Sequence, residues 1–269
     1  MRRGLILVLA VLGIASGAVA SAGAVQICLR TSVGCGVPNL VATFGGSVSP
    51  LKLPENEYAP VTASVFGKIG TANGAHPPAL REVEFDIDKD VKINVKGYPV
   101  CGGIQLEERG PRAAMKACSG AFLGEGRANV EIAATEGAPT QVSSRLLIFN
   151  GGEESGMPKL LAYTFVSFST PTAIVTRIAV QKGGTGLHTV AKIPVIAEGM
   201  GSLLDFKFKL GKTYSYKGKK VGYFEARCPD GVFKANVKKI LFKNEAHTAG
   251  EGAQTSLKGA FAVPCTPQG

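Results

Sequence analysis

Alternation of apolar and polar residues dominates the chain and predicts β-strands. In residues 60–69, Val61, Ala63 and Val65 fall on one face, whereas Thr62 and Ser64 fall on the other. Turn-forming stretches such as "NGGEESGMP" and "KGGTG" separate segments of this kind. The same pattern recurs near residues 82–88, 91–95, 128–134, 142–149, 159–168, 173–181, 188–195, 202–210, 221–228, 232–242 and 256–263.

The segment "REVEFDIDKDVKINVKG" (residues 81–97) is expected to form a hairpin with one buried face. Its polar face carries both signs of charge. Glu84 and Asp86 on the first strand can lie opposite Lys92 and Lys96 on the second, an attractive cross-strand arrangement.

A calcium site is the competing interpretation of the same segment. Asp86, Asp88 and Asp90 have the alternate spacing that opens an EF-hand loop. Val91 stands where such a loop needs glycine for its sharp turn, and Gly97 stands where it needs a bidentate glutamate. The cross-strand interpretation is therefore favoured, and no metal ligand is assigned.

Only one segment, "GPRAAMKACSG", has a helical pattern, with Pro111 suited to the first turn and Gly120 to the C-terminal cap. Many strands and one short helix predict an all-β fold, either a β-sandwich or a curved barrel-like antiparallel sheet. The helix would join a smaller lobe at residues 38–100 to a larger lobe at residues 121–265.

Two of the expected strands, residues 159–168 and 173–181, are apolar on both faces. A central strand that is covered on both sides would account for this pattern. Alternatively, one face lines a cavity for an apolar ligand. In the first strand the two faces carry Leu160, Ala162, Val166 and Phe168 on one side, and Leu161, Tyr163 and Phe165 on the other.

The N-terminal residues have the order of a secretory signal peptide. Arg2 and Arg3 precede an apolar run, and small-residue cleavage patterns end at Ala20 and Ala24. We interpret residues 1–24 as the signal peptide and residues 25–269 as a secreted β-rich domain. No later stretch is apolar enough to span a bilayer, so an extracytoplasmic location is expected.

The six cysteines of an exported chain are typical of disulfides. None has the tight Cys-x-x-Cys spacing of zinc sites, and none has a histidine nearby to act as a base. Six thiols allow many pairings. Nearest neighbours favour Cys28–Cys35, Cys101–Cys118 and Cys228–Cys265.

Other candidate chemistry is weakly signalled. Glu107-Glu108 and Glu153-Glu154 stand in polar turns, where solvated charge is the usual explanation. The glycines of "GEGRAN" (residues 124–129) precede a strand and not a helix, so we expect a turn and not a phosphate loop. No catalytic residue or cofactor is assigned. The three histidines are scattered along the chain, at His76, His188 and His247.

Positive charge is concentrated in the C-terminal third. Residues 205–243 carry 11 basic and three acidic side chains, a net charge of +8, within a chain of net charge +10. An anionic envelope polymer or lipid headgroups are the expected partners of this region, and nucleic acid is not expected outside the cell. The candidate contact residues are Lys207, Lys209, Lys217, Lys219, Lys220, Lys234 and Lys238.

Seven stretches form a recognisable set: "GKIGTANGAHPPAL" (67–80), "KGYPVC" (96–101), "KACSGAFLGEGRANVE" (116–131), "LIFNGG" (147–152), "TAIVTRIAV" (172–180), "SYKGKKVGYFEARCPDG" (215–231) and "VPCTPQG" (263–269). Together they resemble an uncharacterised family of secreted, cysteine-containing, β-rich actinobacterial proteins. The resemblance covers most of the predicted secreted domain. It implies no activity, cofactor or catalytic residue, and it does not include Cys28 or Cys35.

Three functions are compatible with the sequence. The leading hypothesis is an exported, non-enzymatic protein of the cell envelope that binds or coats a partner. The first alternative is a carrier of an apolar ligand such as a lipid, which predicts a cavity behind residues 159–181. The second alternative is a hydrolase of envelope polymers, which predicts convergent carboxylates in a cleft.

Overall fold

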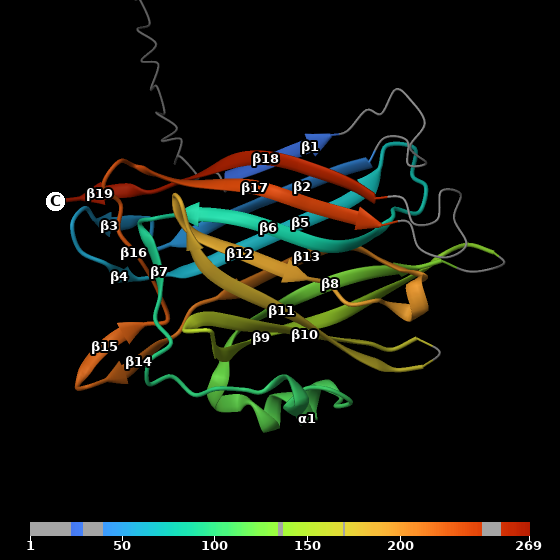
Figure 1. Ribbon diagram of the computed structural model, residues 1–269, viewed down its shortest axis with the longest axis horizontal. Coiled ribbons are helices and arrows are strands. Elements are labelled where there is room, and N and C mark those ends of the chain that lie inside the picture. Colours follow the sequence, from blue (N-terminus) through green and yellow to red (C-terminus); the bar gives the residue numbers. More distant parts are fainter. Residues whose placement is uncertain (1–22, 29–39, 134–136, 169, 244–253) are drawn as a thin grey trace, which may run out of the picture.

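The structure, a computed structural model, describes residues 23–28, 40–133, 137–168, 170–243 and 254–269. It confirms the all-β prediction. A 12-stranded antiparallel sheet curls until its two edge strands, β1 (Gly23–Cys28) and β18 (Gln254–Pro264), lie beside each other (Figure 1). Of the two predicted architectures, the curved barrel-like sheet is the one observed.

Strands from both predicted lobes are neighbours in this one sheet. β5 and β6 come from residues 38–100, and they pair with β13, β12 and β17 from residues 121–265. Between β1 and β18 the order is β2 (Leu40–Ser49), β5 (Thr62–Thr71), β13 (Gly201–Leu210), β8 (Phe122–Ile132), β9 (Thr140–Glu154), β10 (Met157–Val166), β11 (Thr172–Gly183), β12 (Gly186–Lys192), β6 (Ala79–Asp88) and β17 (Val232–Lys243).

Short elements gather at the ends and on the outside of the sheet (Figure 1). One end carries a three-stranded sheet of β4 (Ala59–Pro60), β16 (Phe224–Ala226) and β7 (Val91–Ile93), and a parallel pair of β3 (Lys52–Pro54) and β19 (Thr266–Gln268). β14 (Thr213–Tyr216) and β15 (Lys219–Gly222) form a projecting hairpin. The helical elements are α1 (Pro111–Ala117), η1 (Gly103–Gln105), η2 (Ser119–Ala121) and η3 (Ala197–Gly199). None of the helices in the described segments is long and apolar enough to cross a bilayer.

The period-two pattern places apolar side chains inside the sheet and charged ones outside. In β13, Phe206, Phe208 and Leu210 belong to the interior, whereas Lys207 and Lys209 are exposed. Successive side chains of a strand point to opposite faces, so one register fixes the position of the whole strand.

The predicted hairpin of residues 81–97 does not form. β6 pairs with β12 and β17, whereas β7 leaves the large sheet and pairs with β16. The lysines expected opposite Glu84 and Asp86 are replaced by Lys239 and Lys238 of β17. Any strand with outward lysines satisfies the same cross-strand pattern, so the local sequence could not select the partner.

The predicted turn at residues 124–129 is also wrong, because Gly124 and Gly126 lie within β8. The backbones of β8 and β13 approach so closely there that a Cβ on Gly126 would come within 1.9 Å of the Lys207 carbonyl oxygen. Glycine is needed at this position for a close backbone contact and not for a turn.

The Cys101–Cys118 disulfide closes a helical clasp, residues 101–121, which packs on the outside of the sheet. Tyr163 on β10 is buried under the clasp and its hydroxyl donates a hydrogen bond to the Arg109 carbonyl. Burial raises the pKa of Tyr163 to about 12. The clasp buries Leu106, Ala114 and Ala121 against Leu147, Phe149 and Leu161. It therefore covers the outer apolar face of β9 and β10.

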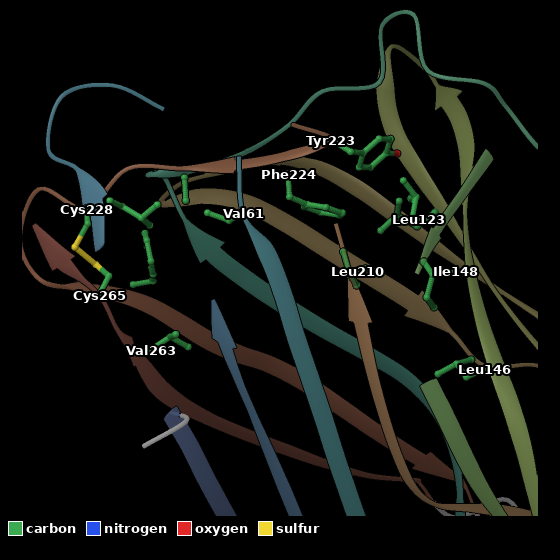
Figure 2. Close-up of a cluster of buried hydrophobic side chains, with 14 residues drawn as sticks. Val61, Leu123, Leu146, Ile148, Leu210, Tyr223, Phe224, Cys228, Val263 and Cys265 are labelled. Carbon is green, nitrogen blue, oxygen red and sulfur yellow. A yellow bond between two sulfur atoms is a disulfide. The ribbon is translucent and has the colours of Figure 1, made fainter. Parts of the chain in front are cut away.

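The Cys228–Cys265 disulfide lies at the end that the short strands cover (Figure 2). Figure 2 shows Tyr223 and Phe224 packed with Leu123 and Leu210 in the same buried cluster. The Tyr223 hydroxyl donates to Asn150 Oδ1 at 2.8 Å, so its polar group is satisfied within the core. Both of these disulfides are predicted pairs; the third predicted pair, Cys28–Cys35, stays a prediction, because Cys35 lies outside the described residues.

Removing either disulfide is expected to destabilise the fold through the entropy of the unfolded chain. The two cysteines are 17 residues apart in the clasp and 37 apart at the covered end. The chain-entropy model then gives losses of about 3 and about 4 kcal/mol of unfolding free energy for the respective double Cys→Ala variants. Urea unfolding measures both. Unfolding free energies equal to that of the oxidised wild type would contradict the expectation. Wild-type protein with reduced disulfides is the control, because it lacks the cross-links but keeps the volume of the cysteine side chains.

Candidate ligand-binding cavity

The inside of the sheet encloses an apolar cavity of about 340 Å³. Residues of eleven strands of the large sheet contribute to its wall. Among the larger ones are Phe44, Phe85, Phe206, Phe208, Ile148, Ile178, Leu187 and Phe261. The volume is at the lower end of the roughly 300–1,000 Å³ range of small-molecule sites.

The number of strands explains why the interior is hollow. About eight strands give a barrel whose interior side chains just fill, and diameter grows with strand number. The 12 strands of this sheet enclose a wider space. Several inward positions also carry small side chains, which leave that space open: Ala63, Ala128, Ala162, Ala191 and Ala235.

Inward-facing residues are only half-buried, which agrees with a cavity. Phe85, Ile178, Phe206 and Phe208 point into the sheet, yet each retains intermediate exposure to a water-sized molecule. The accessible surface of these side chains lies on the cavity wall. The apolar inner face of β10 and β11 thus lines a cavity, in agreement with the second interpretation of these strands, while the clasp covers apolar side chains on the outer face.

Different contacts lie at the two ends of the sheet. At the end with the short strands, Glu225 is buried and accepts hydrogen bonds from the Gly222 amide and from Lys92 Nζ, at 2.9 and 2.8 Å. Burial alone would raise the pKa of Glu225, but these hydrogen bonds outweigh it and hold the pKa below its ordinary value. At the opposite end, Ile196 beside η3 packs with an apolar cluster that includes Val130 and Ile174.

The seven predicted lysines lie on β13, on β17 and on the β14–β15 hairpin, and of these seven only Lys234 borders the cavity. Lys207 and Lys209 are on the outer face of β13, and Lys234 and Lys238 are on the outer face of β17. Lys217, Lys219 and Lys220 are exposed on the β14–β15 hairpin, which projects from one end of the molecule (Figure 1).

The aspartates considered for calcium have other partners. Asp86 accepts from His188 Nδ1 at 2.8 Å and is paired with Lys238 at 3.3 Å, and Asp90 is paired with Arg227 at 2.7 Å. Burial would raise the pKa of Asp86, but the hydrogen bonds from His188 and Lys238 lower it below its usual range. In the described segments, no group of three or more His, Cys, Asp or Glu residues could hold a metal ion.

The structure brings a serine, a histidine and a glutamate into contact, a group that was not predicted from the sequence. His76 places Nε2 at 3.1 Å from Ser202 Oγ and Nδ1 at 2.8 Å from Glu131 Oε1. This is the order of groups in a hydrolytic triad. No local motif signals it, because Ser202 is 126 residues from His76 and Glu131 is 55 residues from it.

The environment of Ser202 favours a structural role. Its side chain is 2% exposed, and its hydroxyl donates to the Pro77 carbonyl at 2.6 Å, which commits its single proton. Ser202 is also absent from the cavity wall. The group therefore anchors the loop before β6 to β13.

The glutamate pairs considered for hydrolysis are exposed. Glu107 and Glu108 lie on the surface of the clasp, and Glu153 and Glu154 lie at the turn between β9 and β10. Glu154 pairs with Lys159 at 3.5 Å. These carboxylates face solvent, as their polar turns indicate.

No protein family, curated protein or solved structure matches the chain.

The buried Ser202 hydroxyl is expected not to react with a fluorophosphonate, which requires an accessible serine nucleophile activated by its histidine. Mass spectrometry of probe-treated protein measures the adduct directly. Ser202→Ala should lower the unfolding free energy by about 1 kcal/mol, the net worth of one hydrogen bond. An adduct on Ser202 that disappears in His76→Ala would instead identify an active centre.

Proposed function

We propose that this protein is an exported, non-enzymatic binding protein that carries an apolar ligand inside its barrel-like sheet. The observation that carries the proposal is the cavity of about 340 Å³ inside the sheet, with a wall made almost entirely of apolar side chains. Preformed apolar cavities with few polar groups are typical of small-molecule sites.

The size of this space argues against a simple packing defect. Protein interiors are close-packed and hold few voids larger than a water molecule, whereas this cavity measures about 340 Å³. Leucine in place of the inward alanines would fill part of the space, so the small side chains at these positions support a role for the cavity.

Export is part of the proposal. Two disulfides are compatible with an extracytoplasmic protein, because thiols in the cytosol are kept reduced. The signal-like N-terminal residues supply the route. They lie almost entirely outside the described part of the chain, and β1 begins at Gly23, within the second predicted cleavage pattern, Ala22-Gly23-Ala24.

Filling the cavity should abolish ligand binding without unfolding the protein. Ala162 lines the cavity, so Ala162→Leu should reduce the affinity for an uncharged apolar dye, N-phenyl-1-naphthylamine, by at least about tenfold. The unfolding free energy should stay equal or rise, since the new side chain occupies a void. Fluorescence titration of delipidated protein measures the affinity.

The matched control is Ala262→Leu, which makes the same substitution at an exposed position of β18. It should leave dye binding unchanged. Equal binding by Ala162→Leu and wild type would place the dye outside the cavity and refute the carrier proposal.

The lysine hairpin supplies a second element of the proposal: contact with anionic lipid headgroups during loading or delivery. Lys217 and Gly218 form its two-residue turn, both with positive φ, which suits a tight hairpin. Tyr214 anchors the hairpin by donating to the carbonyls of Asn94 and Lys96. The lysines are therefore held on a defined projection and not on a loose loop.

Replacing Lys217, Lys219 and Lys220 by glutamine should weaken binding to phosphatidylglycerol vesicles. Each basic residue near an anionic surface contributes about 1 kcal/mol to membrane binding, so loss of three should lower the partition coefficient for the vesicles on the order of 100-fold. Cosedimentation at low and high salt measures the partition and its screening. A control triple variant removes exposed lysines elsewhere, Lys89, Lys182 and Lys258. Equal losses in the two variants would show that only net charge matters.

A further inference from the structure

Three threonines on neighbouring strands bring hydroxyl groups to the mostly apolar cavity wall: Thr164 on β10, Thr176 on β11 and Thr189 on β12. Ser47 and Ser64 also border the cavity, but they are cross-strand partners that alternate with the inward Val48 and Ala63, so their side chains take outward positions. Two of these hydroxyls are satisfied by backbone carbonyls. Thr164 donates to Arg145 at 3.1 Å, and Thr189 donates to Phe85 at 3.3 Å. Thr176 has no hydrogen-bond partner within the described part of the chain.

The free hydroxyl of Thr176 is open to the cavity. Every fully buried side-chain nitrogen or oxygen of the described residues has a partner, so an unpartnered hydroxyl must be reachable by a small molecule. Thr176 takes an inward position between Ile174 and Ile178 on β11. Its cross-strand neighbour on β10 is Ala162, whose small side chain leaves room beside the hydroxyl.

Charge is kept out of the same space. The one charged residue that borders the cavity in the described chain is Lys234, whose strand neighbours Phe233 and Ala235 take the inward positions. Lys234 itself is exposed. An ionised carboxylate or phosphate inside this cavity would lose its hydration without gaining a partner, which is strongly unfavourable.

We propose that the cavity selects an uncharged, single-chain or single-ring-system lipid with one hydrogen-bonding group, a hydroxyl or a carbonyl, that pairs with Thr176. This inference rests on the carrier function and names the ligand class. The modest volume favours one chain over a two-chain lipid. A threonine hydroxyl both donates and accepts, so alcohols, esters and ketones all satisfy it.

Four C12 probes test the inference by displacement of N-phenyl-1-naphthylamine from delipidated protein: dodecane, 1-dodecanol, methyl dodecanoate and dodecanoate. Thr176→Val keeps the side-chain shape and removes the hydroxyl. This variant should lower the affinity for 1-dodecanol and for methyl dodecanoate roughly fivefold, the change expected for one net hydrogen bond. Its affinity for dodecane should equal that of wild type. At pH 7.5 dodecanoate should bind at least about tenfold more weakly than its methyl ester.

The control variants separate a specific contact from a general loss of fold. Thr176→Ser keeps the hydroxyl and should restore the preference for 1-dodecanol. Thr164→Val and Thr189→Val remove hydroxyls that are already bonded to the backbone. Both should leave the ratio of alcohol to alkane affinity as in wild type.

The failure of this inference differs from the failure of the carrier function. If dodecanoate binds most tightly, or if Thr176→Val leaves the ratio of alcohol to alkane affinity unchanged, the proposed ligand class is wrong while the carrier function stands. If none of the four probes displaces the dye from wild type, the carrier function itself is wrong.

Discussion

Closure of a sheet with 12 strands is the constraint on which the rest of this structure depends. A sheet with one apolar face must bury that face, and curling until the edges meet does so without a second layer. The same curling brings the two edge strands beside each other, although no backbone ladder joins them in the described segments. The number of strands then fixes the width, and the width exceeds what the inward side chains can fill. The cavity is thus a geometric consequence of the strand count, tuned by inward alanines such as Ala128 and Ala162.

Outward side chains of the sheet are stabilised in two ways, according to whether they are charged or apolar. Where outward side chains are charged, neighbouring strands supply opposite charges, as in the contacts of Asp86 with His188 and Lys238. Where they are apolar, as at Phe149 and Tyr163, the clasp covers them. Both faces of β9 and β10 are therefore apolar for different reasons: one face packs under a covering segment and the other borders a space. Periodicity alone could not separate those reasons.

Much of the local structure could be predicted from the sequence, because strand periodicity is a local property. The strand near residues 202–210 and the helix at Pro111 appear as expected. Long-range choices could not be predicted. Several strands carry outward lysines, and the tertiary fold, not the local sequence, determines that β17 is the one that pairs with β6. The free hydroxyl of Thr176 is likewise invisible in the sequence, since Thr164 and Thr189 have the same side chain and differ only in the carbonyl groups around them.

The two disulfides lie at segments that the backbone hydrogen bonds of the large sheet do not hold on both sides. No backbone ladder joins β1 to β18 in the described segments, so β18 is an edge strand although the sheet is nearly closed. Cys265 directly follows β18 and links it to Cys228, next to β16 at the covered end. Cys101 and Cys118 fasten a clasp that lies outside every ladder of the large sheet. A sheet that encloses empty space gives up part of its packing energy. Restriction of the unfolded chain at these two places offsets that loss without adding a side chain to the cavity.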